Sequence, residues 1–181
     1  MLRGEADADV PCDGCTACCT SAMFLHVGID EHDALARIPP ELLVPAPGRP
    51  DLLVVGYDEN GHCPMFVDGA CSIYSDRPRT CRHYDCRVFA AAGVEPHQPA
   101  IAPRVREWQF TTDDDSAAAL RAVSAAAAFV ATRAAELGDV APRGATRIAL
   151  AAIRLRHLFG DGEPKVDAVR VELTPRRVSS T

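Results

Sequence analysis

Residues 12–19 read Cys-Asp-Gly-Cys-Thr-Ala-Cys-Cys and contain half of the eight cysteines in the chain. Two residues separate Cys12 from Cys15 and Cys15 from Cys18, a gap that lets two thiolates reach one tetrahedral metal ion. Cys18 and Cys19 are adjacent, so their side chains point in roughly opposite directions if the backbone is extended. This pair therefore serves two metal centres more easily than one.

The other four cysteines form a second cluster further along the chain: Cys63, Cys71, Cys81 and Cys86. A structural zinc ion takes four thiolates, and a [4Fe–4S] cluster also takes four. Eight cysteines exceed either need, which favours two metal centres or one multinuclear centre. We predict that residues 12–19 share their sulfurs with the second cluster and that the ligands are Cys12, Cys15, Cys18, Cys19, Cys63, Cys71, Cys81 and Cys86.

Disulfides are the alternative use of these thiols. The N-terminal segment has no apolar run typical of a secretory signal peptide, so we expect a cytoplasmic protein. Disulfides are rarely stable in a reducing cytosol, where such patterns more often bind metal. Adjacent cysteines such as Cys18 and Cys19 also pair poorly, because disulfide geometry needs Cβ vectors that converge.

Composition restricts the partners. The formal net charge is −6, which disfavours a general nucleic-acid binder. No stretch approaches the ~20 apolar residues that a membrane-spanning helix needs. We expect metal ions as partners and neither nucleic acid nor membrane, and we leave a peptide, protein or small-molecule partner open.

Apolar and β-branched runs predict strands at residues 23–27 and 52–57 on either side of a short helix at 31–37. Asp30 is the expected N-cap of that helix. Residues 58–61 form a turn with Asn-Gly at its centre, so a hairpin leads into the second cysteine cluster.

The second half of the chain is rich in alanine. A stripe of apolar residues at three- and four-residue steps predicts a long helix over 113–137, and another over 145–159. Alternation predicts strands at 104–110 and 166–173. The proline-rich segment 93–103 is expected to connect the two halves.

These elements predict an α+β fold, with a small irregular cysteine-rich metal-binding core and a helical C-terminal half. We expect a disordered N-terminus over residues 1–11 and a metal-binding domain over 12–92. A connector, strand and two-helix region over 93–174 packs on the core, and 175–181 is a tail.

Two histidines and four arginines accompany the second cluster. His62 precedes Cys63 and His83 lies between Cys81 and Cys86, so either imidazole could replace or tune a thiolate ligand. The arginines are interpreted as charge balance for an acidic site. The alternative is an electropositive wall that lowers thiolate pKa values or holds an anionic substrate. They are Arg77, Arg79, Arg82 and Arg87.

The two cysteine patterns together resemble the YkgJ-type cysteine-cluster family of C-x-x-C-x-x-C-C zinc- or iron-chelating proteins. The second pattern is carried by Cys63-Pro64-Met65-Phe66, Gly69, Cys71-Ser72-Ile73-Tyr74, Arg77-Pro78 and Cys81-Arg82. The resemblance covers roughly residues 12–90. In many relatives an aromatic-proline pair follows the last motif, whereas His83-Tyr84-Asp85-Cys86 stands here.

The resemblance implies a zinc or iron site, with an iron–sulfur cluster as one form of it. It does not imply one reaction. Our first hypothesis is a metal-binding protein. The alternatives are an iron-dependent or iron–sulfur enzyme acting on a peptide or small molecule, and a redox or metal sensor. A closed site with four protein ligands on each ion favours the first, and an open coordination position favours an enzyme.

Overall fold

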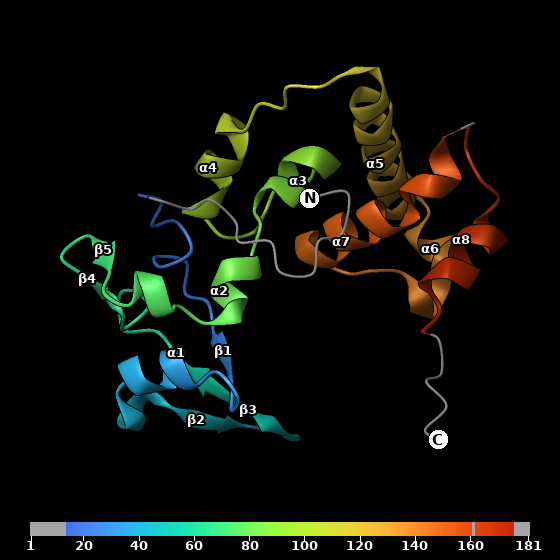
Figure 1. Ribbon diagram of the computed structural model, residues 1–181. Coiled ribbons are helices and arrows are strands. Elements are labelled where there is room, and N and C mark those ends of the chain that lie inside the picture. The colour runs from blue at the N-terminus through green and yellow to red at the C-terminus, as the bar shows by residue number, and fades with distance from the viewer. Residues whose placement is uncertain (1–13, 161, 176–181) are drawn as a thin grey trace. The chain divides into compact units, whose positions relative to one another are not determined.

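The computed structural model describes residues 14–160 and 162–175 (Figure 1). Cys12, the predicted N-terminus 1–11 and residues 176–181 of the predicted tail lie outside the described part. The described chain divides into two compact units, one with residues 14–85 and Gln98–Arg104, the other with Cys86–His97 and the rest from Val105 on. Helices make up 49% of the chain and both sheets are antiparallel, which confirms the α+β class. The domain boundaries stay predictions.

The first unit contains a three-stranded antiparallel sheet. β1 (Leu25–Gly28) pairs with β3 (Arg49–Val55), and β3 pairs on its other edge with β2 (Val44–Ala46). Leu25 lies opposite Val55 across the first pair. Both predicted strands are confirmed, and β3 begins three residues earlier than its apolar run because Arg49 already pairs with β2.

The predicted helix follows β1 as α1 (His32–Arg37), and a 3-10 turn, η1 (Pro40–Leu42), follows it. The predicted N-cap is wrong. Glu31 occupies that position and no side chain caps the helix. The Asp30 carboxylate instead accepts a 2.5 Å hydrogen bond from Arg79, 49 residues further on.

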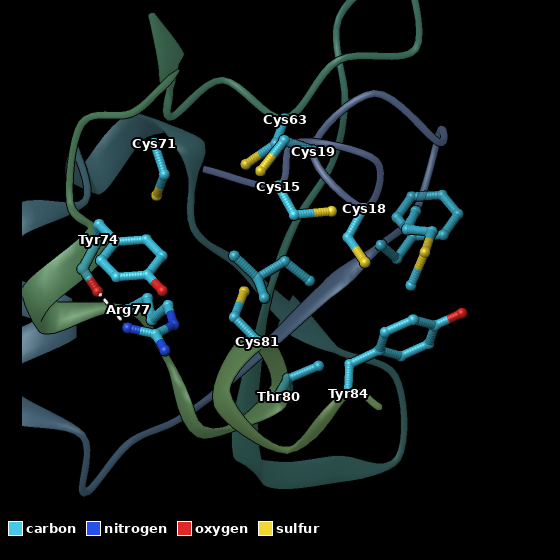
Figure 2. A pocket seen from close by; sticks show the side chains of 13 residues that line it. Cys15, Cys18, Cys19, Cys63, Cys71, Tyr74, Arg77, Thr80, Cys81 and Tyr84 are labelled. Atoms are coloured by element: carbon cyan, nitrogen blue, oxygen red, sulfur yellow. Dashed lines mark hydrogen bonds between the residues drawn. The ribbon is translucent and has the colours of Figure 1, made fainter. Parts of the chain in front are cut away.

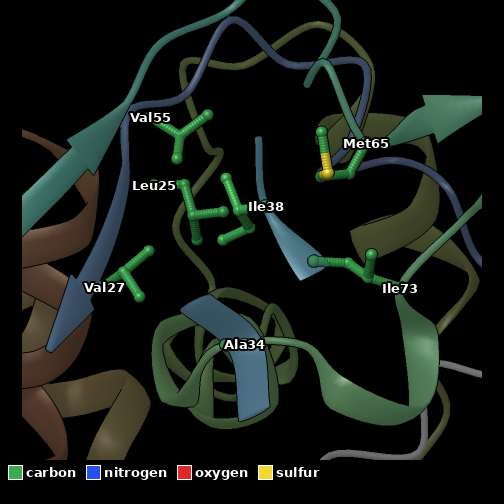
Figure 3. Close-up of a cluster of buried hydrophobic side chains, with 7 residues drawn as sticks. All are labelled: Leu25, Val27, Ala34, Ile38, Val55, Met65 and Ile73. Carbon is green, nitrogen blue, oxygen red and sulfur yellow. The ribbon is translucent and has the colours of Figure 1, made fainter. Parts of the chain in front are cut away.

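Seven apolar side chains form the core of this unit (Figure 3): Leu25, Val27, Ala34, Ile38, Val55, Met65 and Ile73. They come from β1, α1, β3 and the loops of the second cysteine cluster. Three cysteines, Cys63, Cys71 and Cys81, pack against this core. The hydrophobic cluster therefore fixes the backbone that carries those thiols.

Short elements position the second cysteine cluster. A two-stranded hairpin joins β4 (Phe66–Val67) to β5 (Ala70–Cys71), and the 3-10 turn η2 (Tyr74–Asp76) follows. The five-residue helix α2 (Arg79–His83) then places Cys81 in its middle. This confirms the predicted irregular character of the cysteine-rich region.

Helices build the second unit. They are α3 (Arg87–Ala92), α5 (Asp114–Thr132), α6 (Ala134–Leu137), η3 (Gly138–Val140), α7 (Ala145–Leu155), η4 (Arg156–Phe159) and α8 (Val166–Leu173). Fully buried Val123 on α5 and Leu155 on α7 belong to its core. Phe129 and Phe159 meet edge to face with ring centroids 5.5 Å apart.

The long alanine-rich helix begins as predicted and ends early. Asp113 is its N-cap and accepts a 2.8 Å bond from the Ser116 N–H. The helix breaks at Arg133, and the chain bends by 77° into residues 134–140. Among the described residues, no single helix is long and apolar enough to cross a membrane, although this bent pair reaches the threshold by length and composition.

Both strands predicted in the second half are wrong. Residues 104–110 belong largely to α4 (Ile101–Glu107), and 166–173 form α8. In a strand, Val169 and Val171 would lie on the same face. In α8, Val169 is buried and Val171 is 73% exposed, so the two side chains lie on different faces. Over eight residues the alternating and helical periods share too many positions to be distinguished.

Candidate metal centre

Six cysteines of both clusters line one pocket of about 100 Å³ in the first unit (Figure 2). Their side chains extend into it from the first cysteine loop, the β4–β5 hairpin and α2. The six are Cys15, Cys18, Cys19, Cys63, Cys71 and Cys81. Cys12 lies outside the described residues, and Cys86 belongs to the second unit. No disulfide joins any two of the seven cysteines in the described part of the chain.

Two backbone hydrogen bonds join the first cysteine loop to the second. The Cys63 N–H donates to the Cys19 carbonyl oxygen, and the Ala22 N–H donates to the Gly61 carbonyl oxygen, both at 2.7 Å. Gly61 has φ +78°, and a Cβ added there would lie 3.2 Å from the Cβ of Ala22. A glycine therefore permits the close approach of the two loops.

A side chain closes the turn that leads into Cys63. The Asp58 Oδ1 accepts hydrogen bonds from the backbone N–H groups of Asn60 and His62, at 2.9 and 2.8 Å. The His62 N–H, and then that of Asn60, hold the pKa of the Asp58 carboxyl below its ordinary value. The predicted turn at 58–61 is thereby confirmed, with its anchor at Asp58. The predicted hairpin is wrong, because β3 pairs with β1 and β2, and the next strand, β4, pairs with β5 instead.

Cys19 of the first cluster and Cys71 of the second influence each other's titration. The neighbouring Cys19 thiol lowers the pKa of Cys71 to about 6. Cys71, together with burial, raises the pKa of Cys19. Such a pair loses its first proton readily and its second with difficulty.

Two further thiols are coupled electrostatically to this pair. Burial and then the neighbouring sulfurs of Cys63 and Cys71 raise the pKa of Cys81 to about 12. Burial also raises the pKa of Cys63, and the Cys71 sulfur adds to the rise. Cys19, Cys63, Cys71 and Cys81 thus form one interacting set, which we call the thiol tetrad.

The arginines near the second cluster have different roles. Arg77 lines the thiol pocket, lies 4.0 Å above the Tyr74 ring and donates to the Tyr74 carbonyl at 2.7 Å. The positive charge of Arg77 lowers the pKa of Cys71 and of Cys81. Its effect is smaller than that of the Cys19 thiol on Cys71 and that of burial on Cys81. Arg79 instead forms ion pairs with Asp30 and Glu31, and Arg87 lies over the Trp108 ring in the second unit.

Neither candidate histidine lines the thiol pocket among the described residues. The His62 ring packs edge-on against Phe66, with centroids 5.4 Å apart. His83 is exposed at the end of α2. In the second unit, Cys86 accepts a 3.3 Å hydrogen bond from the indole N–H of Trp108.

The donor set of the pocket fits zinc or iron, because clustered thiols are the soft ligands that both metals accept. Within residues 14–160 and 162–175, no three His, Cys, Asp or Glu side chains are placed to hold one ion as they stand. Binding would therefore require thiol side chains to rotate toward a common point.

Several pocket residues were not predicted from the sequence. Met23, Phe24 and Tyr84 form apolar walls, and Thr80 lines the pocket beside Cys81. Tyr74 also lines it. Thr80 and Tyr74 adjoin cysteines in the second pattern, which is the signal that could have identified them.

A family model described as "CxxCxxCC: Putative zinc- or iron-chelating domain" matches residues 11–113. The matched region is more than half of the 181-residue chain and includes both cysteine clusters. The chain belongs to this CxxCxxCC family. Membership supports zinc or iron chelation as its general function. No curated protein and no solved structure gives a significant match to the chain.

Proposed function

We propose that this CxxCxxCC protein chelates zinc or iron through a centre in which the thiol tetrad supplies four thiolates. The supporting observation is that Cys19 of the first cluster lines one pocket together with Cys63, Cys71 and Cys81 of the second. Four thiolates satisfy one tetrahedral zinc ion or one [4Fe–4S] cluster.

We assign Cys15 and Cys18, which line the same pocket, to a second centre. Cys12 and Cys86 stay ligands that the sequence alone predicts. When bound, the metal offsets the negative charge of its thiolates.

An iron-dependent or iron–sulfur enzyme is the second candidate, and one observation favours it. The pocket is lined by more than ligands: Met23, Phe24 and Tyr84 form apolar walls, and Arg77 adds a cation. Phe24 is 59% exposed, and its ring lies tilted against that of Tyr57, with the ring centroids 5.2 Å apart. Walls of this kind suit an organic or peptide ligand held beside a metal with an open position.

We also infer a cytoplasmic location. The clustered cysteines of residues 14–160 and 162–175 are not joined in disulfides, which suits a reducing compartment, where such clusters bind metal more often than they form disulfides.

Quantitative metal analysis of tetrad variants tests the proposal. Replacing Cys63 or Cys81 by serine is expected to remove one bound ion or cluster from the purified chain. Replacing Cys15 is expected to reduce the content of a different centre, so the two losses add. Full metal loading in Cys63→Ser would exclude the tetrad as a binding site.

A further inference from the structure

Only 9% of the Glu31 side chain is exposed. It lies between β1 and α1, far in sequence from any cysteine of the second cluster. A buried carboxylate is costly unless hydrogen-bond donors satisfy its oxygens. The hydrogen-bond donors to the Glu31 carboxylate therefore indicate its role.

Both carboxylate oxygens of Glu31 accept backbone N–H groups. Oε2 accepts from Gly28 at 2.7 Å, and Oε1 accepts from Arg79 at 2.6 Å. The Arg79 guanidinium adds a charge contact, with Nε 3.6 Å from Oε1. One side chain therefore ties the end of β1 to the first residue of α2.

Helix α2 receives no capping hydrogen bond from the side chain of its own N-cap residue, Pro78. Glu31 satisfies the Arg79 N–H from 48 residues away. The next residue, Thr80, donates its hydroxyl to the His26 carbonyl at 2.8 Å. Cys81 follows directly, so two consecutive residues dock α2 on β1 immediately before the thiol.

Gly28 leaves space for this arrangement. A Cβ at position 28 would crowd the ends of the Asp30 and Arg79 side chains and would lie 3.3 Å from the Glu31 Oε2. Glycine at this position therefore leaves these three polar groups in their places beside β1.

We propose that Glu31 is a positioning residue for the metal centre, which fixes the start of α2 so that Cys81 faces the other thiols of the tetrad. The inference rests on the proposed chelating function and adds a residue that the cysteine patterns do not contain. Residues that orient metal ligands without touching the metal typically change affinity 10–100-fold when replaced.

Positioning and simple electrostatics predict opposite results. The negative charge of Glu31 adds slightly to the rise in the pKa of Cys81, behind burial and the neighbouring sulfurs. If charge were its main influence, removing the carboxylate would favour the thiolate and strengthen metal binding. If Glu31 positions α2, the same change weakens binding.

Co²⁺ titration of the full-length chain after removal of its metal separates these outcomes, because thiolate-to-cobalt absorption reports both affinity and coordination. Glu31→Ala is expected to lower Co²⁺ affinity about 10–100-fold and to change the visible bands. Glu31→Gln keeps the volume and one acceptor oxygen, and is expected to fall between Glu31→Ala and wild type. If Glu31→Ala does not fold, the Co²⁺ affinity of Glu31→Gln tests the proposal in its place. Asp33→Ala removes an exposed carboxylate from the same helical turn and is expected to titrate like wild type.

A double-mutant cycle connects the effect to one ligand. In a Cys81→Ser background, Glu31→Ala is expected to cause no further loss of affinity, because the thiol that it positions is absent. Unchanged or stronger Co²⁺ binding in both Glu31 variants, or losses that multiply in the double variant, would overturn the inference. A wild-type chain without any thiolate–cobalt band would overturn the chelating function as well.

Discussion

The backbone N–H of Cys63 donates a 2.7 Å hydrogen bond to the carbonyl oxygen of Cys19. This bond joins the two cysteine loops, which are separated by more than forty residues of sheet, helix and turn. Together with the Ala22–Gly61 bond, it sets the distance between the first cluster and the second. Perturbing this contact should therefore affect metal binding and stability together.

Gly61→Ala is expected to reduce both. The positive φ costs about 1–2 kcal/mol for any residue with a Cβ, and the 3.2 Å approach to Ala22 adds crowding. Gly69→Ala is the matched control, since Gly69 has φ +79° and a Cβ there meets nothing within 4 Å. Chemical denaturation and metal analysis should show a larger loss for Gly61→Ala, and lowered metal content in that variant alone. Equal effects of the two substitutions would contradict the role of the loop contact.

The turn at Asp58 predicts a pH dependence. Backbone N–H groups lower the folded-state pKa of Asp58, so its contribution to stability is present above the unfolded pKa, roughly 3.9. The contribution is lost as pH falls through the lowered folded value. The difference in unfolding midpoint between wild type and Asp58→Ala should be present at neutral pH and shrink in acid. Glu59→Ala, in the same exposed turn, should show little difference at either pH, and a pH-independent difference for Asp58→Ala would contradict the account.

The helical core of the second unit predicts a loss of stability that leaves the metal in place. Leu155 is completely buried on α7, so Leu155→Ala should lower the free energy of unfolding by about 2–5 kcal/mol through lost burial and a cavity. Leu150, on the same helix, is 54% exposed, and Leu150→Ala should change stability little. Denaturation followed by circular dichroism measures both. Loss of the tetrad's metal in a folded Leu155→Ala sample would contradict this prediction.

Ligand replacement distinguishes the tetrad from the other pocket thiols. Cys19→Ser removes the first-cluster thiol of the tetrad, which also lowers the pKa of Cys71. It should lower metal content and stability, since part of a binding free energy of roughly 10–16 kcal/mol for a structural zinc site is lost. Mass spectrometry under native conditions counts the ions that remain. If the Cys19→Ser chain keeps the metal content of the wild type, Cys19 is not a metal ligand.

Local patterns predicted the part of the site that depends on spacing. Gaps of two residues between cysteines, and the Asn-Gly turn before Cys63, are short-range features, and the structure brings six of the eight predicted ligands to one pocket. The long helix was predictable because Asp113 is a strong N-cap signal and because the apolar stripe that follows it extends over several turns. Residues 104–110 and 166–173 were too short for the helical and alternating periods to differ.

Other features depend on long-range contacts that no local pattern contains. Glu31 meets Arg79 across 48 residues, and neither residue type signals that pairing. The same applies to Asp30, which looks like a helix cap in sequence and instead pairs with Arg79. Tertiary contacts override local capping preferences where a charged partner is close.

Anaerobic purification, followed by elemental analysis and a visible absorption spectrum, tests the central claim most directly. The account predicts bound zinc or iron in an amount that matches four thiolates per centre, about two centres for eight cysteines. A colourless protein with zinc would identify a zinc chelator, and a brown protein with acid-labile sulfide would identify iron–sulfur clusters. A folded chain that contains neither zinc nor iron, with its cysteines free or joined in disulfides, would contradict the account.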